Sequence, residues 1–197
     1  MNRPAIKAGY PRNYEANVLP GLPTSGPEPL DFRATPHGRG REGFVVEVRL
    51  GNERWVGNFQ RGDGKLSGIY PTPSSGHVCV IASGRGYWVS TSSPARYDIV
   101  EAYPVQDVLT IPDLLLLIFV DYTALAAYGP DGLRWRSSRV SWDGIRISHA
   151  DANGIEGRGW DASTEQEVGF FVHTVTGRAE GGAAPPSTSD GPHNGAK

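Results

Sequence analysis

The residues best suited to chemistry lie close together, between positions 134 and 160 of the chain. Exposed tryptophan beside arginine is the composition of a binding hot spot between proteins, and the same pair can stack on a sugar or a nucleobase. We predict no catalytic residue. The candidate residues for binding a ligand or a partner are Arg134, Trp135, Arg136, Trp142, Asp143, His149, Asp151 and Trp160.

The same residues allow a purely structural interpretation. Neighbouring side chains of an extended strand point to opposite faces, so Trp135 would face the core while Arg134 and Arg136 face solvent. We therefore expect core packing for Trp135 and a charged sheet face for the two arginines.

Metal binding has little support in the pattern. Oxygen-bearing side chains between His149 and Gly154 resemble the first half of a calcium loop, but the twelfth position is Trp160 instead of a bidentate glutamate. Asp and Asn before Gly favour a tight turn instead. His77, His149 and His173 lie in separate segments without a metal-binding spacing. We predict no metal and no cofactor.

Nucleophilic and phosphate chemistry are also weakly supported. The single cysteine, Cys79, lies in an apolar run, where a lone cysteine usually serves as a small buried hydrophobe. The glycine-rich segment Ser83–Gly86 lacks the lysine and the following helix of a phosphate loop. We expect a protein that is not an enzyme. The open alternative is a small-ligand binder or a hydrolytic enzyme with a site formed by the loops of Asp143, His149, Asp151 and Trp160.

Length and charge limit what the chain can be. Its 197 residues suffice for one domain of ordinary size plus tails, and a formal charge of −2 gives no reason to expect a nucleic acid partner. The longest apolar run, Leu114–Val120, is far shorter than the ~20 residues of a membrane-spanning helix, and residues 1–21 lack a signal-peptide core. We expect a cytoplasmic protein without membrane contact, and the sequence sets no expectation for its oligomeric state.

The elements that must position these residues have the pattern of β-strands. Apolar runs from Leu114 to Ile147 are separated by Asp131-Gly132 and Asp143-Gly144, and Asp-Gly is a strong signal for a two-residue hairpin turn. Side chains from Phe44 to Leu50 alternate with a period of two. No long helical periodicity occurs. The sequence predicts an all-β antiparallel meander, arranged as a β-sandwich or a partial β-propeller.

The two ends of the chain differ in composition from its middle. Seven prolines occur before position 37, and proline removes backbone donors and disfavours both helix and central strand. The last residues are rich in small and polar types and too poor in apolar ones to pack. We predict a largely irregular Pro/Gly-rich arm over 1–42, a single all-β domain over 43–178 and a disordered tail over 179–197.

An apolar strand, a short turn and a second strand recur three times, over 78–90, 115–128 and 155–173. The central copy continues into Tyr128, Asp131-Gly132 and Trp135, and it resembles a blade of the quinoprotein-type β-propellers. That resemblance implies blades arranged around an axis. Any antiparallel meander with glycine turns produces a similar pattern, so both arrangements stay open.

The last third of the chain also resembles a group of uncharacterised bacterial all-β proteins. The motifs that carry this resemblance are Trp135-Arg136, Ser141–Gly144, Gly157–Asp161, Thr176-Gly177 and Gly181-Gly182. It implies a small bacterial domain and brings no activity with it. We therefore predict a non-catalytic protein-interaction or accessory module that binds another protein, and an immunity-type role is compatible with its size.

Overall fold

The computed structural model describes residues 9–35 and 42–183. These residues form sixteen strands and one 3-10 turn, Pro112–Leu114. All strands belong to four four-stranded sheets, none of which closes into a barrel. The prediction of an all-β, largely antiparallel meander is confirmed. Within the described ranges, no helix is long and apolar enough to cross a membrane.

Each sheet is assembled from neighbouring parts of the chain. Sheet A has the order β1 (Glu15–Val18), β3 (Phe44–Leu50), β4 (Glu53–Phe59) and β2 (Leu30–Phe32). Sheet B comprises β5 (Gly68–Pro71), β6 (His77–Ala82), β7 (Arg85–Ser90) and β8 (Tyr97–Ile99). Sheet C comprises β9 (Asp107–Ile111), β10 (Leu116–Val120), β11 (Leu125–Gly129) and β12 (Gly132–Arg136). Sheet D comprises β13 (Ile145–Ala150), β14 (Gly154–Asp161), β15 (Gln166–His173) and β16 (Ala179–Gly181).

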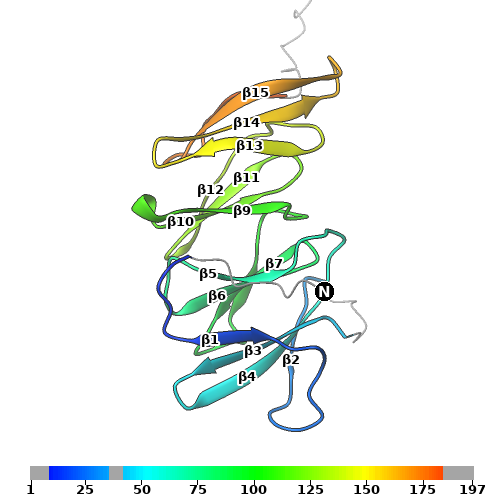
Figure 1. Cartoon of the computed structure of the whole chain (residues 1–197), viewed down its shortest axis with the longest axis vertical. Coiled ribbons are helices and arrows are strands. Elements are labelled where there is room, and N and C mark those ends of the chain that lie inside the picture. Colours follow the sequence, from blue (N-terminus) through cyan, green and yellow to red (C-terminus); the bar gives the residue numbers. More distant parts are fainter. Residues whose placement is uncertain (1–8, 36–41, 184–197) are drawn as a thin grey trace, which may run out of the picture.

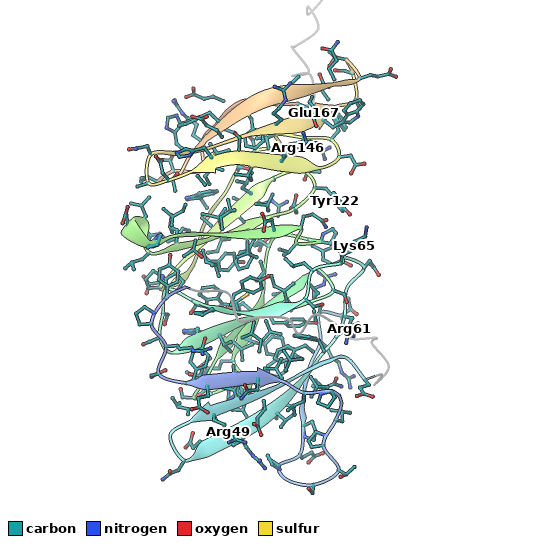
Figure 2. The ribbon with its side chains drawn as sticks, viewed as in Figure 1. Arg49, Arg61, Lys65, Tyr122, Arg146 and Glu167 are labelled. Atoms are coloured by element: carbon teal, nitrogen blue, oxygen red, sulfur yellow. The ribbon has the colours of Figure 1, made fainter. Side chains whose placement is uncertain are left out.

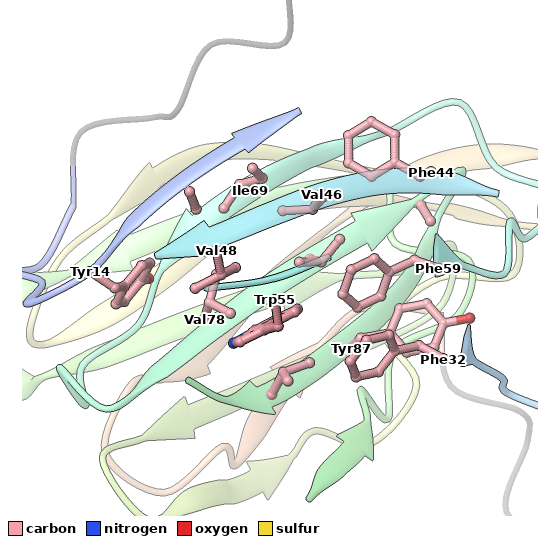
Figure 3. Close-up of a cluster of buried hydrophobic side chains, with 14 residues drawn as sticks. Tyr14, Phe32, Phe44, Val46, Val48, Trp55, Phe59, Ile69, Val78 and Tyr87 are labelled. Atoms are coloured by element: carbon pink, nitrogen blue, oxygen red, sulfur yellow. The ribbon is translucent and has the colours of Figure 1, made fainter. Parts of the chain in front are cut away.

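The four sheets are stacked along the long axis of the molecule in the order A, B, C, D (Figure 1). One hydrophobic cluster lies between each pair of neighbours. The cluster between A and B includes Phe59 and Tyr87 (Figure 3), the next joins Trp88 to Phe119, and the third joins Ile118 to Val172. None of the three clusters joins sheet A to sheet D. The stack is therefore open, with two outer faces.

The stacking explains the long apolar runs of the middle third. Successive side chains of a strand point to opposite faces, so β6 places Val78 and Val80 in the cluster with sheet A and Cys79 in the cluster with sheet C. All residues of β10 and β11 are buried. Strands covered on both faces are apolar throughout. The three repeated segments of the sequence are the central strand pairs of sheets B, C and D, and β3–β4 is the fourth such pair.

Two short strands lie within the arm that the sequence predicts to be largely irregular over 1–42. Glu15–Val18 and Leu30–Phe32 form β1 and β2 at the two edges of sheet A, and the Phe32 ring stacks on Phe59 at 4.2 Å. Pro20, Pro23, Pro27 and Pro29 lie between these strands and do not interrupt them. Strands of four and three residues are too short to show a period. At the other end, Ala179–Gly181 forms β16, which corrects the predicted start of the tail. Residues 1–8, 36–41 and 184–197 lie outside the described ranges.

Two tyrosines of the N-terminal segment provide a matched test of its docking. The Tyr10 hydroxyl donates to the Leu116 carbonyl at 2.6 Å and lies 3.2 Å from the Ile111 carbonyl, whereas the buried Tyr14 hydroxyl has no hydrogen-bond partner among the described residues. We expect Tyr10→Phe to lower the free energy of unfolding by about 1–2 kcal/mol, because buried acceptors lose a donor. Tyr14→Phe should leave stability unchanged or raise it. Urea denaturation of both variants checks this, and equal losses would contradict it.

Candidate functional site

In the part of the chain that the structure describes, no other sheet covers the side of sheet D that faces away from sheet C, and we call this side the outer face. Ile155, Phe170 and Val172 point inward to the third cluster. The alternating residues point outward, and they include large aromatic and charged side chains. The outer face carries Arg146, Glu156, Arg158, Trp160, Glu167, Gly169, Phe171, His173 and Glu180.

The opposite end of the stack is different. Val45 and Val56 point away from the first cluster, yet each is only 2% exposed. The β1–β2 segment runs along this side, where Gly26 lies against the Arg54 side chain. The end of the stack at sheet A is thus covered by the chain itself, whereas no other described segment covers the outer face of sheet D.

Two arginines share one carboxylate at one end of the outer face. Arg146 Nη2 lies 3.2 Å from Glu167 Oε1, Arg158 Nε lies 3.3 Å from Glu167 Oε2, and Arg158 Nη2 donates to the Glu167 carbonyl at 2.8 Å. Figure 2 shows Arg146 and Glu167 on this last sheet. Such exposed pairs contribute little to stability, but they hold both guanidinium groups in place with donors to spare. The groups line a hollow of about 370 Å³ that Asp143 and Trp160 also border.

The two tryptophans at this end are held by backbone and serine contacts. The buried Ser141 hydroxyl donates to the Gly144 carbonyl at 2.6 Å and accepts from the Trp160 amide at 2.9 Å, and the Trp142 amide donates to the Trp160 carbonyl at 2.8 Å. The Arg139 guanidinium lies 4.7 Å from the Trp142 ring centre. Trp142 and Trp160 remain 37% and 38% exposed. The backbone of both tryptophans is therefore fixed, while their indole rings remain accessible.

His149 and Asp151 lie at the other end of the β13–β14 hairpin. Asp151 Oδ1 accepts from the amides of Asn153 at 2.7 Å and Gly154 at 3.0 Å, and His149 Nε2 lies 3.3 Å from Oδ2. These backbone hydrogen bonds, that of Gly154 first, lower the pKa of Asp151 to about 2. The carboxylate closes a tight turn, as the structural interpretation of the sequence expects.

The residues of the alternative enzymatic site are therefore not brought together. Asp143 and Trp160 border the same hollow, whereas the Asp151 turn closes the opposite end of the hairpin. Among the described residues no group of three or more His, Cys, Asp or Glu could hold a metal ion. Cys79 is fully buried, which raises the pKa of its thiol and disfavours the nucleophilic thiolate.

The remaining candidates belong to sheet C. Trp135 is half-buried between sheets C and D, donates from Nε1 to the Thr174 carbonyl at 2.9 Å and lies against Gly177. Arg136 Nη2 pairs with Asp121 Oδ2 at 2.8 Å. Arg134 is exposed, with its aliphatic part against Gly129. This arrangement matches the expected core packing of Trp135, and these three residues lie away from the outer face of sheet D.

Sequence reasoning missed Arg146, Arg158, Glu167, Phe171 and Gly169 as members of this surface. The only sequence signal for Gly169 is that it is a glycine in the middle of a strand, with no turn residue beside it. In comparisons with known proteins, no family model matches the chain and no curated protein is similar to it. The resemblances to propeller blades and to a bacterial group stay predictions.

Proposed function

We propose that this protein is a non-catalytic interaction module of a bacterial cytoplasm, with an accessory or immunity-type role, which binds another protein through the outer face of sheet D. The observation that carries the proposal is the contrast between the two ends of the stack. One end is covered by the chain's own β1–β2 segment, and the other presents Trp160, Arg158 and Phe171 to solvent.

The composition of this face supports a protein partner. Tryptophan and arginine dominate the energetics of protein interfaces because they combine large apolar area with directional donors. The side chains stand on paired strands, so little freedom is lost when a partner docks. The shared carboxylate of Glu167 positions Arg146 and Arg158 in advance.

The experiment compares four immobilised proteins, the wild type and three variants, in lysate of the native host, with the retained proteins identified by mass spectrometry. We expect a protein that the wild type retains to be depleted at least about tenfold by Arg158→Glu, since a reversed charge at the centre of an interface costs more than about 1.4 kcal/mol. Arg49→Glu is the matched control. Arg49 is similarly exposed and paired with one carboxylate, but it lies on sheet A at the opposite end of the molecule (Figure 2).

The second variant of the outer face, Trp160→Ala, should deplete the same protein. Circular dichroism of all variants verifies that the fold is intact. A partner that is retained equally by Arg158→Glu and Trp160→Ala, or lost equally with Arg49→Glu, would contradict the proposal.

A further inference from the structure

Gly169 is unusual among the strand glycines of the described ranges. A Cβ added at Gly57, Gly86, Gly154, Gly157 or Gly159 would come within 3 Å of a neighbouring atom, so packing requires glycine there. Gly132 and Gly181 have positive φ, which also requires glycine. At Gly169 a Cβ would meet nothing within 4 Å, and φ is not positive.

Glycine in the interior of a strand weakens it, and it often marks a place where another group approaches the backbone closely. Gly169 lies in the middle of β15 and is exposed. Among the described residues, none lies within 4 Å of the position that a Cβ of Gly169 would take. The space is therefore open to a group of another molecule.

The neighbouring side chains lean away from Gly169. Arg158, its cross-strand partner on β14, is drawn to Glu167. The ring of Phe171 lies over Gly154, with its centre 4.8 Å from that of His173. Between them a shallow, open hollow of about 610 Å³ lies over Gly169, and its lining includes Glu156, Phe171 and Glu180.

The walls of this hollow carry carboxylates with spare acceptors. Glu156, Phe171 and Glu180 are cross-strand neighbours in one row. Among the described residues none forms an ion pair with Glu156. Glu180 receives His173 and Arg178 at one oxygen, Oε1, which leaves Oε2 for another donor. The one basic wall residue, Arg158, is already engaged by Glu167.

We propose that the hollow over Gly169 receives an arginine or lysine side chain of the protein partner. The aliphatic stem would cross the glycine floor beside Phe171, and the charged end would bind the carboxylates of Glu156 and Glu180. Long basic side chains suit such a site because an apolar stem and a cationic head are combined in one residue. The inference rests on the proposed function, since it names the chemistry by which the partner is recognised on this face.

The test uses the full chain and small probes, so it does not depend on identifying the partner. The amides of Gly157, Gly169 and Gly181 are followed by nuclear magnetic resonance during titration with N-acetyl-arginine amide or N-acetyl-lysine amide. We expect saturable shifts with a Kd on the order of 1–10 mM, typical of a single anchor side chain. N-acetyl-norleucine amide, which has a similar stem without the charge, should shift these signals several-fold less.

Two variants test the walls and the floor separately. Glu156→Gln should weaken binding of the basic probe at least about threefold, whereas the matched control Glu53→Gln, at an exposed position of sheet A, should not. Gly169→Val fills the floor and should abolish binding. Because a β-branched residue suits an open strand position better than glycine, we expect Gly169→Val to raise the melting temperature by about 2–4 °C.

The outcomes separate this inference from the proposed function. Equal binding of the norleucine probe, or unchanged binding by Glu156→Gln and Gly169→Val, overturns the basic-anchor inference. If the basic probe binds as expected but a partner protein is insensitive to Arg158→Glu, the hollow stands and the proposed function fails. A partner that is lost with both Arg158→Glu and Gly169→Val supports both.

Discussion

Asp121→Ala is expected to lower the free energy of unfolding by about 3 kcal/mol. The carboxylate is 2% exposed and follows β10, where it organises the turn into β11. Oδ1 accepts from the Thr123 amide at 2.7 Å, the Thr123 hydroxyl at 3.0 Å and the Ala124 amide at 2.8 Å, and Oδ2 pairs with Arg136 at 2.8 Å. Alanine would leave buried donors without an acceptor in the centre of sheet C.

Asp151→Ala is the matched control because it removes the same kind of turn. Its Oδ1 also accepts two backbone amides, but the carboxylate is exposed, so water can replace it. Chemical denaturation of both variants should show a large loss for Asp121→Ala and a much smaller one for Asp151→Ala. Similar losses at both positions would show that turn closure, and not burial of the donors, determines the effect.

The interior of the stack was predictable because its strands are covered on both faces. A run such as Leu116–Val120, ended by a turn, has few alternatives to a buried strand once no helical period is present. Asp131-Gly132 forms the predicted hairpin between β11 and β12. The same prediction is wrong for Asp143-Gly144, which connects sheet C to sheet D and closes no hairpin. The repeated strand pairs were visible for the same reason, since each internal sheet must bury two apolar surfaces.

The edges of the sheets were less predictable. β1 and β2 have four and three residues, and they are stabilised by contacts that are distant in sequence, such as the stacking of Phe32 on Phe59. The pattern of apolar and polar residues within a short segment contains no information about such contacts. The prolines of this segment disfavour central strands, but edge strands tolerate them nearby.

The candidate residues fall into two groups, according to whether the sheet face that carries each side chain is covered by a neighbouring sheet. The sequence grouped Trp135 with Trp160, but the first lies between two sheets and the second on the outer face. Alternation within one strand can be deduced from sequence. Whether a face is covered depends on which sheet follows, and sheet D is the last of the stack. Gly169 was missed because it matters only through the open space above it. That space exists because the side chains of Arg158 and Phe171 lean away from it, which the sequence does not show.

Gly177→Ala is expected to destabilise the attachment of sheet D by about 3 kcal/mol. Gly177 has φ of +73°, which disfavours any side chain. A Cβ there would also lie 2.6 Å from the Trp135 ring, and displacing a packed indole adds to the cost. Gly132→Ala is the control, since Gly132 has φ of +100° but open space at its Cβ. We expect it to cost about 1–2 kcal/mol, the strain alone.

The open stack determines where this damage should be observed. Because each sheet packs only on its neighbours, an interface can fail without unfolding the whole chain. Hydrogen exchange should therefore accelerate in β14 and β15 of Gly177→Ala, while β3 and β4 at the other end keep the rates of the wild type. Gly132→Ala, which leaves the Trp135 contact intact, should not show this gradient. Uniform acceleration over all four sheets would mean that the stack unfolds as one cooperative unit.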